Sequence, residues 1–508
     1  MKRQIVNIVN FVRGCEPRLE VDLVKPVKEQ IRLIEEYRLS GTFLLQYDAL
    51  VRPDITDLLR GLDSERYELG VWHEIVEEQA VASGIEWRGR YPWDWHTDCD
   101  CSVGYTKAER ERLVDTVYSK FKEIFGYYPR VFGSWLFDTH TIRYISERYG
   151  IDAACNCKEQ YGTDGYTLWG GYYGQGYYPS RNNVFLPASS REGQINVPIF
   201  RMLGSDPVYQ YDLDIDREQT EPKIQSVITL EPACDIGGGS AEWTEWYMRE
   251  NFNGECLSFG YTQVGQENSF GWEKMERGLT MQHALLRRLV DEGRITVECL
   301  GESGRFFKRE YESTPASAIT AHCAYDDPDK SSVWYSSSKY RINLYSDSEG
   351  VRIRDMHVFS DNLPDPFEDT VCRESSASYE ALPVVDGNRN TGRGVLAGIY
   401  PVYDEGAEPR YERMSFTDLG DNRARVDYGE LSFTLSESCV RVDSPVPLRL
   451  ELRRGIDGGH TPTVRAVSQK RLDLSYLDTD YSLTLSRGKF LDGDVIQSEC
   501  GVIEINIE

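Results

Sequence analysis

Apolar runs and helical periodicities alternate through the first 300 residues, in the order that repeated βα units produce. The apolar runs are short and are bounded by polar or turn-forming residues. They predict strands at residues 5–12, 42–47, 68–72, 131–137, 152–155, 226–230, 256–260 and 295–299. Segments with one apolar face predict helices between these strands, at residues 27–37, 54–62, 139–149 and 275–289.

Thr106 and Glu109 mark the start of the clearest helix, because they have the spacing of a capping box. Its apolar face follows at once, at Leu113, Val114, Val117, Phe121 and Ile124. Two segments interrupt the βα pattern. One is an aromatic and polar insertion at 84–104, and the other is a loop of about 60 residues after the fifth strand, far longer than most connections. A loop of that length is typical of a functional segment.

Beyond about residue 310 the helical period gives way to short alternating runs, such as 340–345, 351–354 and 431–435. Asp-Gly, Gly-Gly and Pro turns separate these runs, as in antiparallel sheets that pack face to face. The pattern therefore predicts an α/β fold with an irregular (β/α)7–8 barrel at 1–315, followed by an all-β sandwich region at 316–508. We expect the barrel to be catalytic and the sandwich to be an accessory domain. Because no flexible linker separates them, an apolar interface should join the two halves.

Composition narrows the range of partners. The 508 residues include 57 Lys and Arg against 83 Asp and Glu, for a net charge of −26. Such a surface repels phosphate backbones and anionic lipid headgroups, which excludes nucleic acid and membranes as partners. No apolar run approaches the 18 residues of a membrane span. A homo-oligomer is compatible with this composition.

The N-terminus begins with basic residues and an apolar stretch, as a signal peptide does. Asn7 and Asn10 interrupt that stretch, and no small-residue cleavage site follows, so we interpret it as the first strand and expect a cytoplasmic protein. The twelve cysteines include two C-x-C pairs, at 99/101 and 155/157, whereas zinc sites usually use C-x2-C. Reduced thiols are therefore expected, with no metal and no cofactor.

Acidic residues follow six of the predicted strands within a few positions. They are Glu16, Asp48, Glu74, Asp138, Glu231 and Glu267. The loops after parallel strands converge at one face, where barrels build their active sites. With 83 acids in the chain, about 40% of three-residue windows contain one by chance, so the whole set is informative and a single member is not.

Carboxylates near aromatic rings suit the cleavage of glycosidic bonds, because one acid must donate a proton while another acts on the anomeric carbon or on water. Nine of the ten tryptophans lie before residue 300, many of them in the insertions, and their rings could stack on sugars. Burial in a core remains the alternative for each of them. We assign substrate binding to Glu16, Arg18, Trp72, Trp95, His96, Trp135, Trp169, Trp243 and Trp246.

Several strings resemble the glycoside hydrolase/deacetylase barrel superfamily, which includes NodB-type polysaccharide deacetylases. The third strand, YELGVWH at 67–73, is similar to the third strand of the deacetylases, and FGYYP at 125–129 precedes a matching fourth strand. NFVRGCEPR at 10–18, TQVGQEN at 262–268 and LGESGRFFK at 300–308 resemble bacterial proteins described as glycoside hydrolases/deacetylases. The resemblance implies a (β/α) barrel enzyme that acts on carbohydrate.

The chain departs from the metal-binding pattern of that superfamily. NodB-type deacetylases bind a divalent metal through an Asp on the first strand and an H-x-x-x-H motif on the third. Here the first strand leads to Arg13, and His73 is followed by Glu77 where the second His belongs. The hydrolase branches place a nucleophilic carboxylate after the fourth strand and an acid on a later one, which the resemblance maps to Asp138 and Glu267.

We therefore expect a glycoside hydrolase that acts on an oligo- or polysaccharide. Asp138 and Glu267 are the expected carboxylate pair, and Asp48, Glu231, His73 and Glu74 are further catalytic candidates. Asp138 could instead cap the helix that begins at Thr139, and His73 could be a hydrogen-bonded core residue. The alternatives for the whole chain are a metal-dependent carbohydrate deacetylase and a non-catalytic carbohydrate-binding protein.

Overall fold

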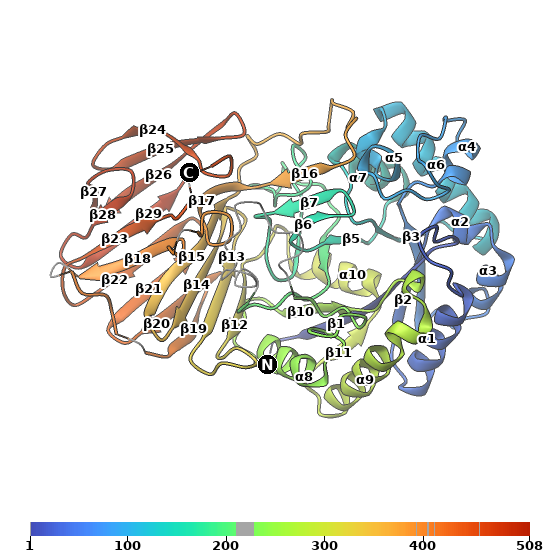
Figure 1. Ribbon diagram of the computed structural model, residues 1–508, viewed down its shortest axis with the longest axis horizontal. Helices are drawn as coiled ribbons and strands as arrows, with labels where there is room; N and C mark the ends of the chain where they lie inside the picture. The colour runs from blue at the N-terminus through green and yellow to red at the C-terminus, as the bar shows by residue number, and fades with distance from the viewer. Residues whose placement is uncertain (1, 210–227, 393, 404–405, 411, 457) are drawn as a thin grey trace.

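The computed structural model of the chain describes residues 2–508 except 210–227, 393, 404–405, 411 and 457 (Figure 1). The N-terminal part forms a curled sheet with helices around it, and the β-rich remainder lies beside that sheet. No helix in the described part of the chain combines the length and apolarity needed to cross a bilayer.

The curled sheet runs in the order β10-β1-β2-β3-β4-β5-β9-β8, and β11 also pairs with β1. Its pairs are parallel except for β8 with β9. The first strand is buried along its whole length, as expected for a parallel strand covered on both faces. The strands are β1 (Gln4–Val12), β2 (Gly41–Leu45), β3 (Tyr67–Trp72), β4 (Val131–Gly133), β5 (Ala153–Cys157), β8 (Gly176–Tyr177), β9 (Ile199–Met202), β10 (Gly260–Val264) and β11 (Thr296–Glu298).

Helices surround this sheet. The capping box of Thr106 and Glu109 is confirmed at the start of α6, which ends at the left-handed Gly126. The helices are α1 (Val24–Glu36), α2 (Tyr47–Leu50), α3 (Pro53–Leu59), α4 (Glu77–Ala82), α5 (Thr97–Asp100), α6 (Lys107–Phe125), α7 (Thr139–Tyr149), α8 (Ala241–Asn251), α9 (Trp272–Asp291) and α10 (Leu300–Glu310).

The β-rich half consists of two large antiparallel sheets (Figure 1). The first contains β12 (Ser317–Ala321), β13 (Ser331–Ser336), β14 (Tyr340–Asp347), β15 (Gly350–Val358), β17 (Leu382–Asp386), β18 (Gly398–Tyr403), β23 (Leu448–Arg453), β28 (Val495–Gln497) and β27 (Lys489–Phe490). The second contains β19 (Met414–Gly420), β20 (Arg423–Tyr428), β21 (Leu431–Ser436), β22 (Cys439–Asp443), β29 (Val502–Ile507), β26 (Thr479–Arg487), β25 (Arg471–Tyr476) and β24 (Thr463–Val467).

Strand β13 is buried on both faces, because it lies between the curled-sheet half and the second antiparallel sheet. Trp334 donates a hydrogen bond to the carbonyl of Pro207 on one side, and the neighbouring Tyr335 donates to the carbonyl of Asn422 on the other. Strand β21 alternates between buried and half-exposed residues instead, so only one face of its sheet is covered. The first sheet is thus the middle layer.

The two halves also share a small three-stranded sheet. Its members are β6 (Gln160–Thr163), β7 (Tyr166–Trp169) and β16 (Ala377–Glu380), and β16 pairs with β7 in parallel across the two halves. Buried polar contacts add to this connection. Glu159 pairs with Arg341, and Trp169 Nε1 donates to Asp386 Oδ2 at 2.6 Å.

Several sequence-based boundaries need correction. The described strands do not close into a complete barrel, because β10 and β8 end the sheet without pairing with each other. The sixth strand is β9, within the long loop, whereas the strand predicted at 226–230 begins outside the described residues and contributes only a bridge at Thr229. Strand β10 starts where the predicted 256–260 strand ends. Residues 300–308, for which no helix was predicted, lie in helix α10.

Candidate active site

Three strands of the curled sheet end at one buried ion cluster. Arg13 follows β1, Glu74 lies just after β3, and Glu267 lies after β10. Nη2 of Arg13 lies 3.0 Å from Oε2 of Glu74 and 3.0 Å from Oε2 of Glu267. The two carboxylate oxygens are therefore no more than twice that distance apart. We call these three residues the Arg13 cluster; their exposures are 1%, 1% and 5%.

The cluster is held by its immediate neighbours. Trp72 Nε1 donates to Glu74 Oε2 at 2.6 Å, and Ser269 Oγ donates to Glu267 Oε1 at 2.7 Å. Asn268 joins the ends of β1 and β10, since its side chain accepts from the amide of Arg13 and donates to the Arg13 carbonyl. A glycine at position 265 allows the end of β10 to lie close to β1. Its φ is 121°, and a Cβ there would lie 2.0 Å from the carbonyl oxygen of Val9.

Two carboxyl groups at the site have raised pKa values. Burial raises the pKa of Glu74 to about 7, with Arg13 opposing the shift and the charge of Glu267 adding to it. Burial also raises the pKa of Asp100 well above its usual value, and the charge of Glu74 contributes. Asp100 is the last residue of α5, and its carbonyl accepts from the amide of Ile75, just after Glu74. The raised pKa of Glu74 therefore favours a proton on this carboxyl group near neutral pH.

Aromatic rings cover the Arg13 cluster and extend from it to the surface. The guanidinium of Arg13 lies 3.7 Å from the centre of the Trp93 ring, and that of Arg18 lies 4.6 Å from it. Trp95 follows, with Arg18 5.1 Å from its ring centre. Tyr91 stacks on Trp95 at 5.8 Å and is 43% exposed. The insertion at 84–104 therefore supplies an aromatic path that leads inward.

Glu16 and Arg18, both predicted to bind substrate, lie at the outer part of this site. Arg18 Nη2 pairs with Glu16 Oε2 at 3.0 Å, and Arg18 Nη1 pairs with Asp164 at 3.3 Å. The Arg18 side chain is 33% exposed and that of Asp164 is 38% exposed. Asp164 lies in the turn between β6 and β7, so the long loop after β5 reaches the mouth of the sheet.

Two further predicted acids lie beside the cluster without pairing with Arg13. Gln266 Nε2 donates to Glu231 Oε1 at 2.8 Å, and burial raises the pKa of Glu231, with the charge of Glu267 adding to the shift. Burial also raises the pKa of Asp48, while hydrogen bonds from the backbone and from Cys15 oppose it. Both acids therefore border the site.

Asp138 has structural partners rather than a place in the Arg13 cluster. Its Oδ1 lies 2.9 Å from Nη1 of Arg110 and accepts from the amide of Thr141 at 2.9 Å, which makes it the N-cap of α7. Glu267 instead pairs with Arg13. The expected pair of Asp138 and Glu267 is thus replaced by Glu74 and Glu267 as the two acids that share a partner. The helix-cap alternative for Asp138 matches these contacts.

His73 is 1% exposed, and neither ring nitrogen has a hydrogen-bond partner within the described residues. Burial lowers its pKa to about 4, against the opposing charge of Asp138. Its ring lies 5.5 Å from that of Phe132. The lowered pKa of His73 thus favours a neutral imidazole, which packs against the Phe132 ring.

The predicted aromatic residues divide into two groups. Trp72 contacts Trp135 edge-on at 5.0 Å, Trp135 stacks with Tyr166 at 6.5 Å, and the ring of His96 lies 6.2 Å from that of Trp95. These residues lie with the Arg13 cluster or its aromatic path. The remaining three tryptophans donate to groups at the junction with the β-rich half or near β9, namely Trp169 to Asp386, Trp243 to Asp206 and Trp246 to the Cys323 carbonyl.

Sequence reasoning missed Arg13, Trp93, Asp100 and Asp164 as site residues. Arg13 directly follows a buried strand, so its position carried a signal; it was considered only as the residue that replaces a metal-binding Asp. Asp100 and Asp164 lie in insertions, where no periodicity indicates which way a side chain faces. Their contribution becomes visible only in three dimensions.

The residues at the mouth do not fit the divalent metal of the deacetylases. Arg13 lies where the first-strand ligand would be, and its cationic guanidinium would repel a second cation. Among the described residues, no three His, Cys, Asp or Glu side chains gather closely enough to hold a metal ion. The Arg13 guanidinium supplies the positive charge that balances Glu74 and Glu267.

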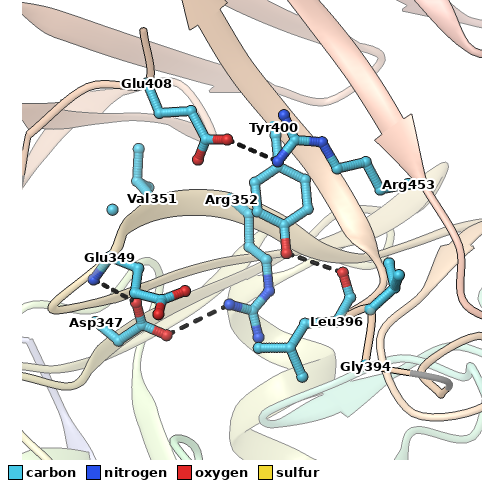
Figure 2. Close-up of a pocket in the computed structure, with 11 residues that line it drawn as sticks. Asp347, Glu349, Val351, Arg352, Gly394, Leu396, Tyr400, Glu408 and Arg453 are labelled. Atoms are coloured by element: carbon cyan, nitrogen blue, oxygen red, sulfur yellow. Dashed lines mark hydrogen bonds and ion pairs between the residues drawn. The ribbon is translucent and has the colours of Figure 1, made fainter.

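A cavity of about 310 Å³ lies elsewhere, in the β-rich half (Figure 2). Its charged groups are paired with one another: Arg453 lies 2.7 Å from Glu408, and Arg352 lies 3.5 Å from Asp347. Tyr400 donates to the carbonyl of Leu396. Because these charged groups pair with one another, the Arg13 cluster is the better candidate site.

Solved structures resemble this fold. A protein of Parabacteroides distasonis described as a glycoside hydrolase/deacetylase aligns with a TM-score of 0.53 at 14% identity, over 75% of this chain and 90% of that one. The chain shares its fold with that structure. A Mycobacterium smegmatis structure described as a polysaccharide deacetylase aligns with a TM-score of 0.34 at 14% identity, over 61% and 91% of the two chains. No family model and no curated protein sequence matches the chain.

Proposed function

We propose that the protein is a carbohydrate-active hydrolase that cleaves glycosidic bonds with Glu74 and Glu267. The observation that carries this proposal is the convergence of both carboxylates on one nitrogen of Arg13, at 3.0 Å each, at the carboxyl ends of parallel strands. The Parabacteroides protein that shares this fold is described as a glycoside hydrolase/deacetylase, which supports carbohydrate as the substrate class.

Glu74 is the proposed general acid. Its pKa of about 7 lets it hold a proton at neutral pH, which it donates to the oxygen of the leaving sugar. Glu267 is the proposed nucleophile, because Arg13 and Ser269 both stabilise its charged form. Carboxyl groups about 5 to 5.5 Å apart are typical of retaining enzymes, and wider pairs of inverting ones. Two carboxylates that share one guanidinium nitrogen favour the retaining mechanism.

Arg13 would act on both partners. Before reaction it compensates the buried charges, and during reaction it would remain paired with Glu267 while Glu74 gives up its proton. The aromatic path of Trp95 and Tyr91 offers ring faces for sugar units at the entrance. A substrate would meet Tyr91 first, because that ring is 43% exposed.

A metal-dependent deacetylase is the second candidate, since the Parabacteroides protein is described as a glycoside hydrolase/deacetylase. Metal-assisted deacetylation needs an open coordination position at a cation held by protein ligands. Arg13 lies where such a ligand belongs, and Glu77 rather than a His follows His73 on the third strand. Catalysis by the carboxylate pair needs neither a metal ion nor its protein ligands.

The amide variants Glu74→Gln and Glu267→Gln test the proposal. Each should lower kcat on a cleaved glycoside by at least about a thousandfold, because an amide can act neither as acid nor as nucleophile. Glu298→Gln is a matched control: Glu298 is also buried, pairs with Arg3 and accepts from Ser303 at 2.7 Å, but it is the last residue of β11 and lies outside the Arg13 cluster. Near-normal turnover in both variants, with their folding intact, would contradict the proposal.

A further inference from the structure

A second set of buried polar side chains lies where β5 and β9 pair. Asn156 of β5 is in register with Arg201 of β9, and Lys158 directly follows β5. The exposures of Asn156, Lys158 and Arg201 are 4%, 5% and 2%. We call these three residues the Lys158 site. Asn156 is flanked in β5 by Cys155 and Cys157, whose side chains face the other side of the sheet.

Each member of the Lys158 site has a polar atom without a hydrogen-bond partner among the described residues. Arg201 donates through Nε to the Cys157 carbonyl at 2.8 Å and through Nη1 to the Tyr172 carbonyl at 3.4 Å, but its buried Nη2 has no partner there. Oδ1 of Asn156 is likewise buried without a partner in the described structure. The amine of Lys158 forms no hydrogen bond or ion pair within it and lies 4.7 Å from the Tyr173 ring centre.

Within the described residues, Glu159 and Asp355 both pair with Arg341 rather than with Lys158 or Arg201. The carboxylate of Glu159 is the nearest in sequence, but it pairs with Arg341, which also donates to the Gly171 carbonyl at 3.0 Å. Among the described residues, neither Lys158 nor Arg201 has an acidic partner. An unpaired buried donor costs about 1 to 3 kcal/mol, and a buried cation without an anion costs more. A bound anion would relieve both.

The backbone at Gly171 is shaped around Arg201. A Cβ at this position would lie 2.7 Å from Nη1 of Arg201 and 2.5 Å from the Phe185 ring. Glycine therefore permits the guanidinium to lie against the loop that also carries Tyr172 and Tyr173. Buried residues and the backbone at Gly171 thus hold the Arg201 side chain in place.

The surroundings of Lys158 also favour the uncharged form of its amine. Burial lowers its pKa to about 7, and the charge of Arg201 lowers it further, against the opposing charges of Glu159 and Cys157. About half of the amines are then uncharged at pH 7. A desolvated lysine next to another cation is a known way of activating an amine for attack on a carbonyl carbon.

We propose that Lys158 covalently binds a small 2-oxo acid, with its amine attacking the carbonyl carbon and Nη2 of Arg201 holding the carboxylate. The lone pair of Nζ forms the C–N bond and gives a carbinolamine. The C–O bond then breaks, and the oxygen leaves as water with the two hydrogens that the amine loses. The product is an imine, so the step needs no oxidant or reductant. The site shares no residue with the Arg13 cluster.

Reductive trapping of the full-length protein tests this proposal. Incubation with glyoxylate and sodium cyanoborohydride at pH 7.5, followed by peptide mass spectrometry, should show Lys158 modified at least about tenfold faster than any other lysine. Its rate should reach half of its maximum near pH 7. Lys308 is the matched control, since its pKa is also lowered by burial but its amine donates to the Ile151 carbonyl. Lys158→Arg should abolish the preferred labelling.

A neutral aldehyde of similar size, glycolaldehyde, tests the role of Arg201. We expect it to label Lys158 at least several-fold more slowly than glyoxylate, since it has no carboxylate for Nη2. Equal labelling by the two probes would overturn the carboxylate part of the proposal. Unmodified Lys158 in the wild-type protein, alongside labelled exposed lysines, would overturn the proposal as a whole, whatever the variants do.

Discussion

A guanidinium between two carboxylates lowers the cost of burying all three groups, because each charge lies 3.0 Å from an opposite one. In the Arg13 cluster this arrangement does more than stabilise the fold. Burial raises the pKa of Glu74, and the single positive charge of Arg13 is shared by two carboxylates, so Glu74 holds a proton at a pH where an exposed glutamate has lost it. A general acid must carry a proton at the pH of the reaction, and the raised pKa of Glu74 meets that requirement.

The proton on Glu74 should be visible in the stability of the protein. A carboxyl group whose folded-state pKa is raised binds more protons when folded, so its stabilising effect is complete below pH 4.5 and is lost as the pH rises through 7. The wild-type free energy of unfolding should therefore fall by roughly 1 to 3 kcal/mol more over this range than that of Glu74→Gln, which lacks the titrating group. Urea denaturation at a series of pH values measures it. Identical pH dependence in wild type and variant would contradict the shift.

The same proton should shape the activity. If Glu74 is the general acid, kcat should fall tenfold for each pH unit above about 7, as the acid loses its proton. Turnover of a chromogenic glycoside between pH 5 and 9 gives this profile. A rate that keeps rising to pH 9 would assign the acid role to another group.

At the scale of elements, the ends of the strands place the residues of the site, and the ends of the helices stabilise the structure around it. Asp138 illustrates the second role, since it caps α7 and pairs with Arg110 while being fully buried. Asp138→Asn should reduce the free energy of unfolding by about 3 to 5 kcal/mol, because Arg110 is left without its anion. Chemical denaturation measures the loss.

The folded fraction of Asp138→Asn should keep kcat within about tenfold of wild type. A loss of several orders of magnitude in a variant that is still folded would instead return Asp138 to the catalytic pair that the sequence pattern suggested. Thr141→Val serves as a control, because it removes the hydroxyl donor to Asp138 without removing the charge.

Much of the fold could be predicted from local patterns. The capping box of α6 and the parallel strands β1 to β3 follow from spacing and apolar periodicity, which the neighbouring residues determine. Strand β9 could not be predicted in this way, because its four residues lie in a long loop and are recognised only by pairing with β5. Helix α10 was missed because LGESGRFFK contains two glycines, and tertiary packing overrides their low helical propensity.

The site was predictable to a lesser degree. Glu74 and Glu267 were found by their positions after strands, whereas their pairing through Arg13 depends on the register of β1 with β10, which no local pattern reveals. The insertion at 84–104 was expected to carry aromatic residues to the mouth. Which of them lies over Arg13 was decided by packing, and it is Trp93.

At the scale of the whole molecule, the two halves complete each other. Strand β7 loses its partner β16 if the β-rich half is removed, and buried groups such as Glu159 and Thr139 lose Arg341 and Asp365. Expression of residues 1–315 alone should therefore give insoluble material, or material without a cooperative thermal transition. Scanning calorimetry of any soluble fraction decides the matter. A soluble, cooperatively melting and active fragment would show that the halves are independent.

Hydrolysis of a panel of chromogenic glycosides by chelator-treated protein tests the central claim most directly. The account predicts that at least one glycoside releases its chromophore, that the chelator leaves the rate unchanged, and that Glu74→Gln and Glu267→Gln abolish the release while Glu298→Gln does not. Release of acetate from an acetylated sugar, lost to the chelator and restored by a divalent metal, with no glycoside cleaved, would contradict it.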